Sequence, residues 1–269
     1  MLRRLHGIAI ATLVIALLAA FGAGPGAAQD KQKPSAGDKS SEAGAAPLSP
    51  AQKRAIEDVV REYILQNPEV IVEAVRGLQE REKQETRERA QKTLATAKEE
   101  LLRDPDSPVG GNPQGDVTIV EFFDYRCGYC KKVQPDLHEV LKTDKKVRMV
   151  FKEFPILGPE SVLASKVAIA AWLTDKGKYE AFHEATMKAT GALPEGRLMK
   201  IAAGVGLDVK ALKKTMDDSR IARFIDKNYA LAEALDIKGT PAFVIGDHIV
   251  RGAIDLEAMK LLITKARGG

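Results

Sequence analysis

The chain has 269 residues, 45% of them hydrophobic and 29% charged, which suffices for one large domain or two smaller ones with a proper core. The formal net charge is only +4, and basic residues are interspersed with acidic ones, so we expect no nucleic-acid partner. The sequence contains only two cysteines, Cys127 and Cys130, and both belong to one short motif.

Residues 1–28 are typical of a secretory signal peptide. Arg3 and Arg4 form a short basic start, an apolar run follows, and small residues lead up to Ala28. The apolar run is shorter than the roughly 20 residues that a membrane-spanning helix needs. We therefore expect cleavage after Ala28 and export to the periplasm. Retention as an N-terminal membrane anchor is the alternative.

Residues 29–49 are rich in Lys, Ser, Gly, Ala and Pro, which predicts a disordered linker. In residues 50–103, apolar side chains recur at helical spacing on both sides of an Asn67-Pro68 break, which predicts two helices. These helices have no core of their own, so their apolar faces must be covered. We expect a homo-oligomer formed through residues 50–100. Packing against the rest of the same chain is the alternative.

The two cysteines form a Cys127-Gly128-Tyr129-Cys130 sequence, here called the CGYC motif, between a predicted strand (residues 117–123) and a predicted helix. Backbone N–H groups and the dipole at a helix N-terminus favour the thiolate of a cysteine there. We expect Cys127 to be exposed, with a lowered pKa, and Cys130 to be buried. A disulfide across two intervening residues closes almost no loop, so the motif indicates thiol–disulfide exchange rather than structural bridging.

Metal binding by the motif is the weaker interpretation. Structural zinc needs about four ligands, and the sequence offers no second CxxC and no nearby His pair. Two thiolates could still hold Cu(I), so Cys127 and Cys130 remain candidate copper ligands. Exchange between thiols and disulfides needs no cofactor, and we expect none.

The order of elements beyond the helical region predicts a thioredoxin-like α/β fold. Residues 147–154 predict a second strand, and residues from about 160 to 235 predict successive helices. Gly239-Thr240-Pro241 then precedes two short apolar runs joined by Gly-Asp, which predict a β-hairpin, and a last helix follows. We assign residues 105–269 to one catalytic domain with a helical insertion at about 160–235.

Two stretches of this domain resemble DsbA-like thioredoxin-fold oxidoreductases: residues 121–130 (EFFDYRCGYC) and residues 239–243 (GTPAF). Leu48-Ser49-Pro50 and residues 67–70 additionally resemble the N-terminal helical region of ScsC (suppressor of copper sensitivity) proteins. The resemblance implies unfolded or disulfide-bonded protein substrates. It also implies a membrane redox partner, either a DsbD/ScsB-like reductase or a DsbB-like oxidase.

The resemblance also assigns roles to individual residues. Pro241 should be cis, which places Thr240 against Cys127 and exposes backbone to an extended substrate. Cys127 should attack disulfides, and Cys130 should resolve the mixed disulfide. Glu121 should be buried with a raised pKa and exchange protons with Cys130. An outward-facing Glu121 is the alternative.

Five further side chains are candidates for roles near the motif or in the core. Lys152, on the neighbouring predicted strand, is a candidate ion-pair partner for Glu121. Tyr125 and Tyr129 are either apolar contacts for unfolded substrates or ordinary surface aromatics. His138 and His183 are expected on helix surfaces or satisfied in the core, not as ligands.

The dipeptide inside the motif predicts the direction of the reaction. Gly128-Tyr129 lacks the imidazole of the Pro-His pair of DsbA, so we expect a couple less oxidising than DsbA's roughly −120 mV. The pair resembles that of DsbC-type isomerases, which are oligomers kept reduced. The leading hypothesis is an exported protein disulfide isomerase or reductase acting on misfolded or oxidised proteins. The alternatives are a DsbA-like dithiol oxidase and a Cu(I)-binding copper-tolerance protein.

Overall fold

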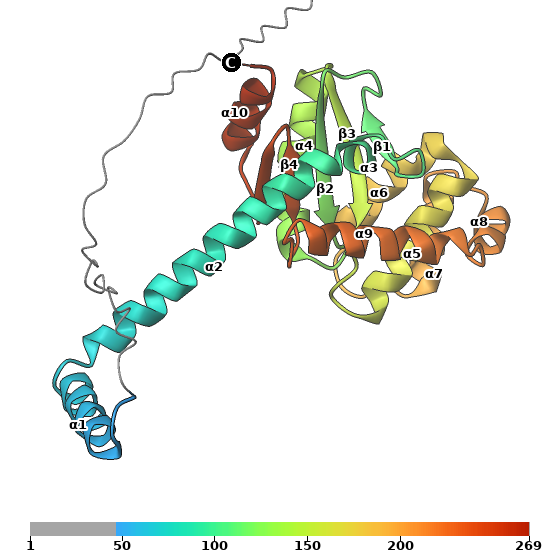
Figure 1. Cartoon of the computed structure of the whole chain (residues 1–269). Helices are drawn as coiled ribbons and strands as arrows, with labels where there is room; N and C mark the ends of the chain where they lie inside the picture. Colours follow the sequence, from blue (N-terminus) through green and yellow to red (C-terminus); the bar gives the residue numbers. More distant parts are fainter. Residues whose placement is uncertain (1–46, 269) are drawn as a thin grey trace, which may run out of the picture. The chain divides into compact units, whose positions relative to one another are not determined.

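A computed structural model describes residues 47–268 of the chain (Figure 1). The predicted signal peptide and residues 29–46 of the predicted linker lie outside the described residues. The chain divides into two compact units between Tyr63 and Ile64, and each is described by itself. Within residues 47–268, no helix is long and apolar enough to cross a membrane.

Helix α1 spans Pro50–Gln66, as the sequence predicts. It begins with a reciprocal cap: Gln52 N donates to Ser49 Oγ at 3.3 Å, and Ser49 N donates to Gln52 Oε1 at 2.9 Å. Pro50 occupies the first helical position, where its missing N–H is not needed. No residue of α1 is buried, although its sequence is amphipathic.

Helix α2 runs from Glu69 to Thr96, directly after the predicted Asn67-Pro68 break. Its first half exposes a row of apolar side chains, and burial starts only at Ala90 and Leu94. The short helix α3, Lys98–Leu102, follows and buries Leu101 completely. The end of this helical region is therefore packed on the sheet. The charged residues 79–89 before it are exposed to solvent, apart from the half-buried Thr86.

A five-stranded mixed sheet forms the centre of the larger unit, in the order β1-β3-β2-β4-β5. Only β2 and β3 are parallel to each other; the other neighbouring pairs are antiparallel. This is the predicted thioredoxin-like arrangement, with the hairpin β4–β5 joined to the central strand β2. The strands are β1 (Val109–Gly111), β2 (Val117–Phe123), β3 (Val147–Glu153), β4 (Ala242–Ile245) and β5 (His248–Arg251).

Strand β1 is absent from the sequence-based prediction, in which the first strand of the catalytic domain is residues 117–123. Its two glycines give no strand signal, because glycine weakens strands and has no side chain to pack. The close fit explains them: a Cβ on Gly110 would lie 2.9 Å from the Phe151 ring, and Gly111 has a φ of +62°.

Helices cover both faces of the sheet. Successive side chains along each strand point to opposite faces, so each strand contributes to two core clusters, one on either side of the sheet. Ile119, Phe123 and Phe151 belong to one core cluster, and Val120 and Phe122 belong to the other. Helices α5 to α9 lie between β3 and β4 in the chain, and Figure 1 shows them grouped together. The helices are α4 (Gly128–Thr143), α5 (Pro159–Thr174), α6 (Tyr179–Lys188), α7 (Glu195–Gly204), α8 (Val209–Thr215), α9 (Arg220–Ala234) and α10 (Leu256–Ala266), with a 3₁₀ turn at Lys176–Lys178.

The predicted pairing of Lys152 with Glu121 is wrong. In the β2–β3 register, Glu121 lies opposite Phe151 and Lys152 lies opposite Phe122, so the two side chains project from opposite faces. Lys152 is completely buried, and its Nζ contacts Asp104 Oδ2 at 3.4 Å and Ser107 Oγ at 2.8 Å.

We predict that Lys152→Met destabilises the protein by about 3 kcal/mol, because it leaves the buried carboxylate of Asp104 with one cation fewer. Urea unfolding measured by circular dichroism gives the free energy. The control is Lys83→Met, which removes an exposed ion pair to Glu80 and should change stability little. Equal effects of the two substitutions would contradict the structural importance of the buried pair.

Candidate active site

The CGYC motif lies where the central strand passes into helix α4. Strand β2 ends at Phe123, and Asp124 ties the following loop together by accepting from Arg126 N at 2.7 Å and from Leu157 N at 2.9 Å. Cys127 is the N-cap of α4, and its Sγ accepts a hydrogen bond from the Cys130 backbone N–H at 3.2 Å. Both thiols are free in this structure.

The expectation that Cys127 is exposed is wrong, since only 5% of the residue is accessible. Its cover includes the loop before β4: the Thr240–Pro241 peptide bond is cis, as the resemblance implies. The Thr240 carbonyl oxygen accepts a hydrogen bond from the Cys127 thiol, with 3.2 Å between oxygen and sulfur. The sequence places these residues far apart, so this contact is tertiary.

The two thiols have opposite pKa shifts. A hydrogen bond from the Cys130 thiol lowers the pKa of Cys127 to about 6, against an opposing effect of burial. The Thr240 side chain and the backbone N–H groups of Cys130 and Tyr129 add to this lowering. Giving that same hydrogen bond raises the pKa of Cys130 well above its usual range, and burial and the charge of Glu121 act in the same direction. Near neutral pH the outer sulfur is therefore a thiolate and the inner one a thiol.

Glu121 faces the core on β2, opposite Phe151 and Phe243, and is completely buried. Neither of its oxygens has a hydrogen-bond partner among residues 47–268. Burial, followed by the charges of Cys127 and Glu153, raises the pKa of Glu121 to about 8. The alternative of an outward-facing Glu121 is therefore wrong.

The aromatic and histidine candidates separate by burial. Tyr125 is completely buried and so cannot contact substrates, whereas Tyr129 is 67% exposed beside the cysteines. His183 is a core residue whose Nδ1 lies 3.1 Å from Tyr125 Oη. His138 is on the surface, with Nδ1 at 3.1 Å from Glu184 Oε1.

Sequence reasoning missed Glu153. It is the last residue of β3, and it is buried, with its carboxyl oxygens accepting from Tyr125 Oη at 3.2 Å, Tyr179 Oη at 3.1 Å and Ser165 Oγ at 2.7 Å. No local pattern distinguishes this acid from a solvent-facing strand residue. Only the covering helices make it part of the site.

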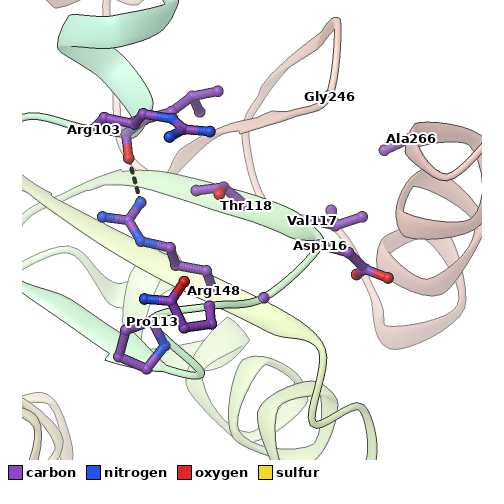
Figure 2. A pocket seen from close by; sticks show the side chains of 11 residues that line it. Arg103, Pro113, Asp116, Val117, Thr118, Arg148, Gly246 and Ala266 are labelled. Carbon is purple, nitrogen blue, oxygen red and sulfur yellow. Dashed lines mark hydrogen bonds between the residues drawn. The ribbon is translucent and has the colours of Figure 1, made fainter.

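The most polar hollow of the described residues lies away from the cysteines. Figure 2 shows it: a hollow of about 480 Å³, lined by Arg103, Asp116, Thr118 and Arg148 at the opposite end of β2 from the cysteines. Within the described part of the chain, no group of three or more His, Cys, Asp or Glu side chains is arranged to hold a metal ion. Cys127 and Cys130 stay the candidate Cu(I) ligands that the sequence offers.

Comparison with protein-family models gives two matches. The DSBA-like thioredoxin domain matches residues 118–264, and the Copper resistance protein ScsC N-terminal domain matches residues 52–85. This chain belongs to the DsbA-like thioredoxin family. Its N-terminal helical region is of the ScsC type, so the resemblance seen in the sequence is confirmed.

Solved structures agree with this assignment. A thioredoxin-like oxidoreductase from Silicibacter pomeroyi is 40% identical, with a TM-score of 0.61, and the match covers 64% of this chain and 98% of that one. ScsC from Proteus mirabilis in a transitional conformation is 28% identical, with a TM-score of 0.62, over 82% of this chain and 97% of that one. The second match therefore extends beyond the catalytic domain.

Curated relatives include the Disulfide bond formation protein D of Bacillus subtilis, 26% identical over 60% of this chain and 78% of that protein. The chain spans only about a quarter of the Na(+)/H(+) antiporter NhaA 1 of Salinispora arenicola, which is 28% identical over 169 residues. Together, these matches place the chain in the family of DsbA-like thiol–disulfide oxidoreductases.

We predict that the reduced protein ionises one thiol with a midpoint near pH 6, measured as the thiolate absorbance in the ultraviolet. Cys130→Ala should move this midpoint upward, toward the roughly 8.5 of a free cysteine, because Cys127 loses its principal hydrogen-bond donor. Cys127→Ala is the control and should abolish the low transition. A wild-type midpoint near 8.5 would contradict the geometry described.

Proposed function

We propose that this protein is an exported protein disulfide isomerase and reductase acting on misfolded or oxidised proteins. The proposal rests on the dipeptide Gly128-Tyr129, which puts no imidazole beside the Cys127 sulfur, and the lowering of the Cys127 pKa to about 6 agrees with it. In DsbA the corresponding value is about 3.5, and the highly stabilised thiolate makes that enzyme a strong oxidant. A thiolate with a pKa closer to ambient pH is a better attacking nucleophile, as isomerisation and reduction require.

The contacts of the site support a two-step exchange. The Cys127 thiolate attacks one sulfur of a substrate disulfide, forming a mixed disulfide and releasing the other sulfur as a thiolate. In isomerisation, a substrate thiolate attacks that mixed disulfide, forms a new substrate disulfide and frees Cys127. In reduction, Glu121 takes the proton of Cys130, whose sulfur then attacks Cys127 Sγ and displaces the second substrate sulfur.

Reduction leaves a Cys127–Cys130 disulfide, so a continuing reaction needs two electrons from a partner. We propose a DsbD/ScsB-like membrane reductase as that partner, in agreement with the family assignment. The basic and apolar segments of residues 1–28 support export to the periplasm, where disulfide-bonded substrates occur.

Substrate recognition is proposed at the cis-proline loop and at Tyr129. The Thr240 carbonyl lies against the reactive sulfur, so a substrate strand held along this backbone would bring its own sulfur within reach. Tyr129 is the large exposed hydrophobic side chain within the motif, and it can pack on unfolded apolar segments. Both contacts are independent of substrate sequence, which suits an enzyme that acts on many proteins.

A second copy of the chain is proposed to cover the helical region. In α1, Ile56, Val59 and Val60 are 49%, 67% and 49% exposed. In α2, Ile71 and Val75 are each 48% exposed, at helical spacing. An exposed apolar row on a helix of this kind marks an interaction site, and the ScsC N-terminal match covers the same residues. The proposed oligomer would present several CGYC motifs to one misfolded substrate.

A dithiol oxidase is the second candidate, favoured by the match to Disulfide bond formation protein D. An oxidase must be held in the disulfide form and pass that disulfide to reduced proteins. The two functions differ in which redox state is active, and one assay separates them.

We predict that the reduced protein restores activity to scrambled ribonuclease in a catalytic amount. Cys127→Ala should lose this activity entirely, because no mixed disulfide can form. Cys130→Ala should retain part of it, since substrate thiols can release Cys127 during isomerisation. Rapid oxidation of reduced ribonuclease by the disulfide form, without recovery of the scrambled enzyme by the reduced form, would identify an oxidase instead.

We predict that Val60→Glu converts an oligomer to a monomer, because it places a charge in the proposed apolar interface. Light scattering in solution gives the mass. The control is Arg61→Gln, an exposed change on the same helix, which should leave the mass unchanged. Isomerase activity should fall several-fold in Val60→Glu, while the reaction of Cys127 with a small disulfide stays the same. A wild-type monomer would disprove the oligomer.

A further inference from the structure

A second buried carboxyl group lies beside Glu121 on the same face of the sheet. In the β2–β3 register, Glu121 is opposite Phe151 and Phe123 is opposite Glu153. Side chains two residues apart on a strand share a face, so Glu121 and Glu153 are diagonal neighbours in one layer. Both are 1% exposed or less.

Within the described residues, each hydrogen bond to the Glu153 carboxyl group comes from an uncharged hydroxyl. Tyr125 is in the loop before the motif, Ser165 is on α5, and Tyr179 is on α6. The Glu153 main-chain oxygen accepts from Asn228 on α9 at 3.0 Å. Glu153 therefore joins the active-site loop to three helices between β3 and β4.

The network has donors sufficient for an ionised Glu153. If all three hydroxyls donate to the carboxylate, Tyr125 Oη can still accept a hydrogen bond. Its donor is the Nδ1–H of a neutral His183 ring, at 3.1 Å. His183 Nε2 then has no partner among the described residues and needs none as a bare acceptor. Burial lowers the pKa of His183 to about 3, so the ring adds no positive charge.

No cation neutralises either carboxyl group in the described structure. The groups that face Glu121 are Cys127, Cys130 and Gln134 from α4 and its N-cap, and Glu153 from β3. Asp124 is the further charged group facing Glu153, and it is also acidic. Lys152 precedes Glu153 in sequence but projects to the opposite layer, where it contacts Asp104.

We propose that Glu153 is a positioning residue for the exchange reaction: its charge sets the pH at which Glu121 can accept the proton of Cys130. This inference rests on the proposed role of Glu121 in the resolving step. Glu153 touches neither sulfur and acts only through Glu121.

The direction of the effect follows from like charges in a medium of low polarity. An ionised Glu153 makes ionisation of Glu121 less favourable, which is consistent with the raised pKa of about 8 for each carboxyl group. Removing the charge at Glu153 should therefore let Glu121 ionise at lower pH. Weakening the hydroxyl contacts should do the same to a smaller extent, because they favour the ionised Glu153.

The test isolates the resolving step in the full-length protein. Reduced protein is mixed with dithiobis(nitrobenzoate) in a stopped-flow instrument. First, the Cys127 thiolate attacks the reagent, forms a mixed disulfide and releases one coloured thiolate. Then Cys130 gives its proton to Glu121 and attacks Cys127 Sγ, which forms the Cys127–Cys130 disulfide and releases the second coloured thiolate. The second phase is unimolecular, and its rate is recorded against pH.

We expect Glu153→Gln to move the pH midpoint of the second phase toward acid by about half a unit or more. The midpoint is the readout rather than the plateau rate, because a carboxylate with a lower pKa is also a weaker base. The first phase should keep its midpoint, since Glu153 does not contact Cys127. In Glu121→Gln, where the proton acceptor is absent, adding Glu153→Gln should produce no further shift.

Two serines on α5 give a matched pair of variants should Glu153→Gln fold poorly. Ser165→Ala removes a donor to Glu153 and should shift the midpoint in the same direction by a smaller amount. Ser161→Ala removes a buried hydroxyl that has no partner among the described residues and should cause no shift.

The outcomes distinguish the inference from the proposed role of Glu121. A second-phase midpoint unchanged in both Glu153→Gln and Ser165→Ala would overturn the role of Glu153, even if both variants lower thermal stability. Equal shifts in both kinetic phases would also overturn it, because Glu153 would then act on Cys127 directly. A normal second phase in Glu121→Gln would instead remove Glu121 as the proton acceptor.

Discussion

The hydrogen bond between the two thiols is the interaction on which the site depends. Cys127 is nearly inaccessible, and burial alone would keep its sulfur protonated. The Cys130 thiol, one helical turn further on, reverses that preference together with backbone N–H groups at the start of α4. The same contact holds the proton on Cys130. This one hydrogen bond therefore favours the thiolate of Cys127 and the protonated thiol of Cys130.

The alternation of side chains along β3 determines how charge is distributed around that pair. Lys152 and Glu153 are adjacent in sequence, but one projects into each layer of the molecule. The lysine is neutralised by Asp104 on its own side, so it cannot offset the acids behind the cysteines. The catalytic layer therefore contains two carboxyl groups and two sulfurs without a contacting cation in the described residues. This is an environment in which protonation states must be coupled.

The helices between β3 and β4 pack on the sheet and also supply hydrogen-bond donors to Glu153. Tyr179 and Ser165 hold the Glu153 carboxyl group, and Asn228 holds its main chain. The N-terminal helices contribute in a different way: α1 and the first half of α2 bury nothing, despite an amphipathic sequence. Amphipathic helices are stabilised mainly by burial of their apolar face, so these need a surface to pack against. A DsbA-like domain behind a ScsC-type helical region unites both features in one chain.

The sequence by itself determined the elements and the reaction class, because these depend on local patterns. The CGYC motif after an apolar strand, the Asn67-Pro68 break and the Gly-Asp hairpin each carry a short-range signal, and the corresponding elements are present. Tertiary structure alone decided the rest: the glycine-rich strand β1, the cover over Cys127, the separation of Lys152 from Glu121 and the inclusion of Glu153. Each of these depends on strand register or on a contact between segments distant in the chain. Strand register and long-range contacts produce no local sequence pattern. Whether an acid or a thiol is buried depends on the segments that pack around it, not on the residues next to it in the chain.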